Sequence, residues 1–171
     1  LGGHGIDLDA ARVRAESDAR MALSCTASWF LGVVLMLTDR VDEARPILMR
    51  LNERAEEEGD VPTTRDMHRL LIELELRAGR LTDAEAWAAA MDDLVIGDAD
   101  HTTNPAALLA LLFARRGRLG DAAAHAEAAA RNASTGDHIV ERSLAEWSTG
   151  AVAMASSDAA AGLAHLLAAN E

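Results

Sequence analysis

The sequence is poor in several residue types on which particular functions depend. Its 171 residues include one cysteine, no tyrosine, three tryptophans and two phenylalanines, and its side chains with a fixed positive charge are all arginines. Cys25 cannot form a disulfide within the chain, which fits a reducing compartment. Because there is no lysine, a Walker A nucleotide-binding loop is excluded. The formal charge of -12 opposes non-specific binding to nucleic acids, which requires a basic surface.

Long apolar runs are missing as well. The most apolar stretch, residues 29–37, is much shorter than the roughly 18 residues that a membrane-spanning helix needs. The first residues contain neither a basic region nor an apolar core, so they do not resemble a signal peptide. We therefore expect a cytoplasmic protein without membrane contacts. The missing initiator methionine suggests a fragment of a longer chain.

The residues that are abundant favour helices. Alanine occurs 37 times, and leucine, arginine and glutamate are also common, whereas β-branched and aromatic residues are scarce. An apolar content of 50% is too high for a disordered chain. The composition therefore predicts an all-α protein, and the length suits one domain.

Turn-forming residues recur at nearly constant intervals. Gly-Asp pairs begin at positions 59, 97 and 136, and a second kind of turn lies between them. The second turns, spaced 40, 38 and 40 residues apart, are centred on Asp39, Gly79, Gly117 and Ser157. A fixed period of this length is typical of stacked helical hairpins. The pattern predicts a right-handed α-solenoid of about four hairpins.

The same spacing sets the expected boundaries. Residues 17–171 form the predicted repeat domain, and residues 1–16 are interpreted as the remnant of a preceding helix or linker. The four hairpins are expected at residues 17–58, 63–96, 105–134 and 138–170. Their helices are expected at residues 17–38, 42–58, 63–78, 82–96, 105–116, 121–134, 138–155 and 158–170.

Small residues recur at fixed distances from the turns. Five residues after the second turns the sequence has Ala44, Ala84, Ala122 and Gly162. Seven residues before them it has Gly32, Ile72, Ala110 and Gly150. Small side chains at facing positions let two helices approach closely, which predicts that these residues lie between the helices of each hairpin.

Three local patterns predict where helices begin. Thr82 with Glu85 has the spacing of a capping box, and Thr63 with Asp66 forms a weaker version of it. Asparagine at position 104 followed by proline at position 105 is typical of an N-cap and a first helical residue.

These features resemble the tetratricopeptide (TPR) hairpin, which has a small residue before the turn, a glycine in it and an alanine after it. The longer period and the missing linker proline resemble the TPR-like region of large ATP-binding LuxR-type transcriptional regulators, the MalT-like group. The stretches that carry this resemblance are residues 37–45, 55–60, 70–88 and 156–166. The resemblance implies a non-catalytic region between an ATPase module and a helix-turn-helix domain, and no catalytic or DNA-reading residue of those parts has a counterpart here.

The candidate site is the concave surface that the first helices of such hairpins line. Tryptophan and arginine dominate binding interfaces, and methionine adapts to varied partners. On this basis the predicted groove residues are Trp29, Met36, Arg69, Glu73, Arg77, Trp147 and Met154. A protein or a small-molecule effector is the expected occupant. In the alternative interpretation Trp29 and Trp147 fill the core between repeats. The third tryptophan, Trp87, lies on a second helix and is expected to pack between hairpins in either case.

Other reactive residues do not form a recognisable site. The six histidines include no His-x-x-x-His pair, and no cysteine cluster accompanies them, so we expect no metal site and no cofactor. The segment 98–101 resembles the start of a calcium loop but lacks its glycine and its distal glutamate. The arginines at 115, 116 and 118 are interpreted as a solvated helix end. We therefore expect no enzyme but a sensing or protein-interaction domain of a LuxR-type regulator, or alternatively a stand-alone adaptor that binds a peptide.

Overall fold

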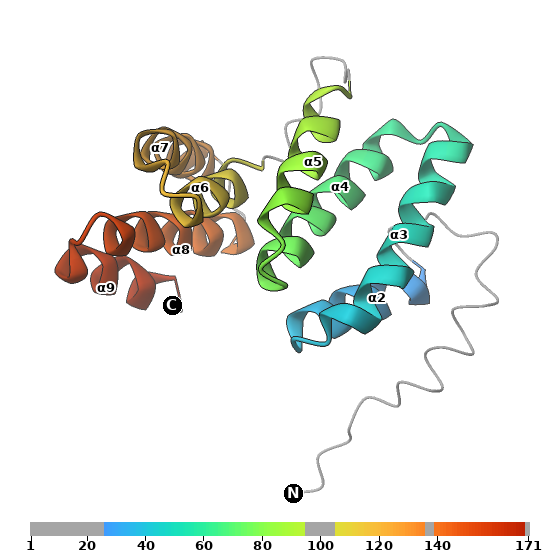
Figure 1. Cartoon of the computed structure of the whole chain (residues 1–171), viewed down its shortest axis with the longest axis horizontal. Coiled ribbons are helices and arrows are strands. Elements are labelled where there is room, and N and C mark those ends of the chain that lie inside the picture. Colours follow the sequence, from blue (N-terminus) through green and yellow to red (C-terminus); the bar gives the residue numbers. More distant parts are fainter. Residues whose placement is uncertain (1–25, 95–104, 136–138, 170–171) are drawn as a thin grey trace, which may run out of the picture.

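The computed structural model describes residues 26–94, 105–135 and 139–169, and every regular element in these ranges is an α-helix (Figure 1). The eight helices of these ranges are α2 (Ala27–Leu37), α3 (Val41–Glu58), α4 (Val61–Arg77), α5 (Leu81–Asp92), α6 (Ala106–Arg115), α7 (Leu119–Thr135), α8 (Ile139–Ala155) and α9 (Ala159–Ala168). The predicted all-α class is confirmed. The segment 1–16 and the beginning of the first predicted helix lie outside the described residues.

The four turns predicted to be equivalent have the same backbone geometry. The values of φ at Asp39, Gly79, Gly117 and Ser157 are 59°, 72°, 73° and 68°, all in the left-handed region. At the second turn, the amide of Gly79 donates to the carbonyl of Leu76 at 3.2 Å, and the amide of Arg80 donates to the carbonyl of Glu75 at 2.9 Å. The same pair of bonds recurs at the other three turns. These are Schellman caps, which satisfy carbonyls at the helix ends and reverse the chain direction.

The helices joined by these turns pack against each other, namely α2 with α3, α4 with α5, α6 with α7 and α8 with α9. The small residues predicted between them are buried, and Ala44, Ala84 and Ala122 have no exposed surface. Helices α8 and α9 approach each other closely at Gly150 and Gly162. A Cβ atom placed on Gly150 would lie 3.0 Å from the carbonyl oxygen of Gly162, so the backbones of α8 and α9 are in contact there. The prediction of close helix pairing at this register is correct.

Apolar side chains between the pairs form two main core clusters. The first core cluster includes Leu35, Leu48 and Leu71, and the second includes Met91 and Leu112. The side chain of Trp87 is partly buried and packs against both clusters, as the sequence predicted.

Helices α2–α5 and α6–α9 form two sets, and contacts between the sets are less extensive than those within each (Figure 1). Helix α6 touches α4 and α5 across this junction. The second core cluster spans the junction, since it contains Ile72 and Leu76 of α4, Met91 of α5 and Leu108 of α6. Partly buried Trp147 of α8 packs against the same cluster.

The predicted capping box of Thr82 and Glu85 is wrong. Helix α5 begins at Leu81, its N-cap is Arg80, and no side chain caps it. The Thr82 hydroxyl and the Glu85 carboxylate instead accept hydrogen bonds from Nη2 of Arg116, at 3.0 and 2.8 Å. A partner from the next hairpin therefore replaces the local backbone amide.

The other two predicted helix starts also differ in detail. Helix α4 is capped by Asp60, whose carboxylate accepts from the amide of Thr63 at 3.1 Å, so Thr63 is not the cap and its pairing with Asp66 is wrong. Pro105 is the N-cap of α6 rather than its first residue, and the residue at position 104 lies outside the described ranges.

Candidate ligand-binding cavity

A cavity of about 800 Å³ lies between α2, α4, α8 and α9. Six of the seven groove residues predicted from the sequence line it: Trp29, Met36, Arg69, Glu73, Arg77 and Trp147. The rest of the lining is one serine and a set of apolar residues, namely Ser143, Val33, Leu37, Leu70, Leu144, Leu166 and Ala169. The cavity therefore has an apolar wall on each side and a charged row along α4.

Helix α2 supplies Trp29, Val33, Met36 and Leu37, which share one face because their spacing follows the helical period. The ring of Trp29 is partly buried and packs on the first core cluster, so it serves the core and the cavity together. It also meets the ring of Phe30 edge-on, with 5.0 Å between the ring centroids. The indole nitrogen of Trp29 is buried without a hydrogen-bond acceptor among the described residues.

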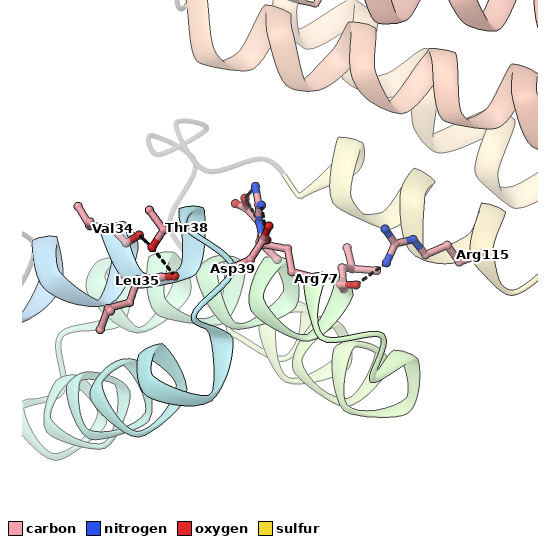
Figure 2. A network of polar contacts seen from close by, with 8 residues as sticks. Val34, Leu35, Thr38, Asp39, Arg77 and Arg115 are labelled. Carbon is pink, nitrogen blue, oxygen red and sulfur yellow. Dashed lines mark hydrogen bonds and ion pairs between the residues drawn. The ribbon is translucent and has the colours of Figure 1, made fainter.

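Helix α4 supplies three charged residues at intervals of one turn. Oε1 of Glu73 accepts hydrogen bonds from Nη2 and Nε of Arg77, at 3.0 and 3.1 Å, and the side chain of Glu73 is only 9% exposed. Nη1 of Arg77 lies 3.7 Å from Oδ1 of Asp39, in the turn after α2 (Figure 2). Glu73 and Arg77 thus form a partly buried ion pair that also links α4 to the first hairpin.

Arg69, the third charged residue, is less fully bonded. Its Nε donates one long hydrogen bond to Oδ1 of Asp66, at 3.3 Å. Its Nη1 lies 3.9 Å from Oε2 of Glu73, which is beyond hydrogen-bond range. The side chain of Arg69 is 22% exposed and lines the cavity, and its terminal nitrogens make no hydrogen bond within the described ranges.

The opposite wall differs from the expectation that the first helix of every hairpin lines the groove. Trp147, Leu144 and Ser143 come from α8, a first helix, but Leu166 comes from α9, a second helix, and Ala169 is the C-cap of α9. Helix α6, the remaining first helix, contributes no residue to the lining. The expectation was therefore wrong for α6, which it assigned to the groove, and for α9, which it did not.

Met154 is the one predicted groove residue that lies outside the cavity. Its side chain is 49% exposed near the end of α8. It lies over Gly162 of α9, where an added Cβ would come within 2.6 Å of the Cγ atom of Met154. Met154 therefore covers the contact between α8 and α9.

Three arginines at the end of α6 were expected to be solvated, but two of them, Arg115 and Arg116, connect the two sets of helices. Arg115 donates to the backbone carbonyl of Leu76 at the end of α4 (Figure 2). Arg116 binds Thr82 and Glu85 of α5, and the guanidinium of Arg118 lies 4.4 Å from the ring centroid of Phe113. Sequence reasoning missed the bridging roles of Arg115 and Arg116, because their partners lie more than thirty residues away.

The buried carboxylate of Glu75 was also missed. It lies on α4 with no exposed surface and accepts a hydrogen bond from Arg45 of α3. Burial raises the pKa of Glu75, against the opposite effect of the Arg45 and Arg80 guanidinium groups. A charged residue in the middle of an apolar run, between Leu74 and Leu76, is the signal that could have indicated it.

The histidines of the described residues occupy unrelated surroundings. His68 is buried beside Trp87, with 5.3 Å between ring centroids, and burial lowers its pKa despite the Glu56 carboxylate 3.5 Å away. His165 of α9 contacts Glu146 of α8 at 2.6 Å. Within residues 26–94, 105–135 and 139–169, no group of three or more histidine, cysteine or acidic side chains could hold a metal ion.

Among the described helices, none combines the length and the apolar character needed to cross a membrane. Searches with the chain against protein-family models, curated proteins and solved structures return no match.

Proposed function

We propose that this chain is a non-catalytic helical-repeat domain that binds an effector or a partner in the cavity between α2, α4, α8 and α9. Its hairpins would stack as a right-handed TPR-like superhelix, in a cytoplasmic LuxR-type transcriptional regulator. One observation carries the proposal: six residues that were selected for their residue type on the predicted first helices line a single cavity, although they come from three different helices.

The cavity has the properties of a ligand site. Its volume of about 800 Å³ lies within the usual range for small-molecule pockets, and such pockets are mostly apolar with a few polar groups. Its tryptophan and arginine side chains are the types that contribute most to binding energy. These features support binding by the domain itself, independently of any neighbouring module.

The location of the cavity suggests how binding could become a signal. Its lining combines residues of α2 and α4 with residues of α8 and α9, which belong to different sets of helices. A ligand that touches both sets stabilises the relative placement in which both can contact it. In a regulator of the kind that the sequence resembles, this change in placement would alter how the attached domains interact.

The binding part of the proposal can be tested by a thermal-shift screen of sugars, nucleotides and short peptides. We expect compounds that stabilise the wild type to stabilise Leu163→Ala as well, because Leu163 is an exposed apolar residue of α9 outside the cavity lining. The same compounds should fail to stabilise Trp147→Ala. Equal stabilisation of all three proteins would contradict binding in the cavity.

The regulator part requires a separate observation. The complete gene should encode a nucleotide-binding module before this region and a helix-turn-helix domain after it. A gene that encodes this domain alone would instead support the adaptor alternative, with the cavity unchanged as the binding site.

A further inference from the structure

The charged side chains of the cavity lining are Arg69, Glu73 and Arg77. Two carboxylates outside the lining also pair with these arginines: Asp66 lies 3.3 Å from Arg69, and Asp39 lies 3.7 Å from Arg77. Glu73 and Arg77 neutralise each other through two hydrogen bonds. Arg69 differs from Arg77 because its hydrogen bond to Asp66 uses Nε alone, so its two terminal nitrogens are not held by that carboxylate.

The guanidinium of Arg69 has unused donors. An arginine has five N–H groups, and among the described residues only Nε of Arg69 makes a hydrogen bond, to Asp66. Nη1 of Arg69 lies 3.9 Å from Oε2 of Glu73, which is close enough for an ion pair but too far for a hydrogen bond. Two terminal nitrogens of one guanidinium match the two oxygens of a carboxylate, which makes such a pair strong and directional.

The surroundings of Arg69 define the rest of the ligand. Arg69, Trp29 and Trp147 are each ten residues before a turn, so the guanidinium and the two indole rings come from equivalent repeat positions. The other lining residues of α2, α8 and α9 are apolar apart from Ser143. Flat apolar groups bind well against tryptophan rings.

We propose that the cavity binds a small monocarboxylic acid with a flat apolar body. Its carboxylate pairs with Arg69, and its body packs against the apolar side chains of α2 on one side and of α8 and α9 on the other. The inference rests on the proposed function and names the chemical class of the effector. A ligand without a carboxylate would lack the two adjacent anionic oxygens that the terminal nitrogens of Arg69 match.

The test uses three probes with the same apolar body: pyrenebutanoic acid, pyrenebutanol and pyrenebutylamine. Their binding is followed by fluorescence anisotropy of the pyrene. We expect the acid to bind about tenfold more tightly than the alcohol, as for one charge-assisted hydrogen-bonded pair, and the amine to bind most weakly.

Variants connect this preference to Arg69. Arg69→Met should reduce binding of the acid to the level of the alcohol and leave the alcohol unchanged. Arg131→Met is the matched control, since Arg131 is an exposed residue of α7 outside the lining, and it should keep the preference for the acid. Circular dichroism establishes that the variants are folded, and Arg69→Gln replaces Arg69→Met if the latter is not.

The possible failures are distinguishable. Equal binding of the three probes, or a preference for the acid that survives in Arg69→Met, overturns the carboxylate proposal. If Trp147→Ala still weakens the binding of all three probes in that case, the cavity remains the binding site and the proposed function stands. If no probe binds the wild type, or if Trp147→Ala has no effect on any of them, the carboxylate proposal fails. The thermal-shift screen then decides the proposed function by itself.

Discussion

Replacing Gly150 by alanine should destabilise the protein, although alanine is the better helix former. A methyl group at this position of α8 would lie 2.9 Å from Cγ of Leu166, 3.0 Å from the carbonyl oxygen of Gly162 and 3.2 Å from Cβ of His165. The carbonyl oxygen belongs to the backbone of α9 and cannot rotate away. The two helices would therefore have to separate.

The expected loss follows from two opposing effects. Overpacking in a tight core typically costs about 1–3 kcal/mol, and the backbone contact favours the upper part of this range. Replacing glycine by alanine inside a helix gains about 1 kcal/mol. We therefore expect Gly150→Ala to lower the free energy of unfolding by about 1–2 kcal/mol, measured by urea denaturation.

Gly120 provides the matched control. It lies in the first turn of α7, and an added Cβ atom would have no neighbour within 4 Å. Gly120→Ala should therefore raise the free energy of unfolding by as much as about 1 kcal/mol. The reasoning is refuted if Gly150→Ala is as stable as the wild type while Gly120→Ala behaves as expected, because α8 and α9 would then not be in backbone contact.

Three other predictions concern stability. Ser157→Gly should raise the free energy of unfolding by about 1 kcal/mol, because Ser157 has a φ of 68°; a loss in urea denaturation would contradict this. Since burial lowers the pKa of His68, its contribution should be complete above about pH 6.5 and should decrease as the pH falls below that value. In thermal denaturation at several pH values, the melting temperature of His68→Phe should fall less with decreasing pH than that of the wild type. Equal falls in the two proteins would argue against burial of a neutral imidazole. Arg45→Met should cost about 3 kcal/mol at pH 7, because it removes the hydrogen-bonded partner of the buried Glu75 carboxylate and leaves only Arg80, 3.9 Å away. Part of this loss should be recovered in acid, where Glu75 is protonated; a loss that is the same at every pH would argue against an ionised Glu75.

The turns and the close helix contacts could be predicted because their causes are local. A left-handed residue ends a helix wherever it occurs, and glycine supplies it at Gly79 and Gly117. Asp39 and Ser157 were identified at the same positions only through the repeat spacing. The small residues in register, such as Gly150 and Gly162, were identifiable for the same reason, since each hairpin has the same requirement for close approach.

Contacts between distant hairpins could not be predicted in this way. Thr82 and Glu85 have the spacing of a local cap, but Arg116 from the next hairpin competes for the same oxygens and binds both. The lining of the cavity also depends on how α6–α9 sit against α2–α5. A repeat register treats all first helices as equivalent, so it assigned α6 to the groove and missed α9.

The junction at α6 has a mechanical consequence. The two sets of helices, each held together by extensive helix packing, meet through one apolar cluster and the contacts of Arg115 and Arg116. Helix α8 has 17 residues and is about 25 Å long, and Trp147 at its middle packs against this cluster, so each end of α8 lies about 12 Å along the helix from that contact. A rotation of α8 by about 10° around this contact would move each end by about 2 Å. The side chains that line the cavity sit on both sets of helices, so an occupant that contacts both would favour one orientation of α8 over another.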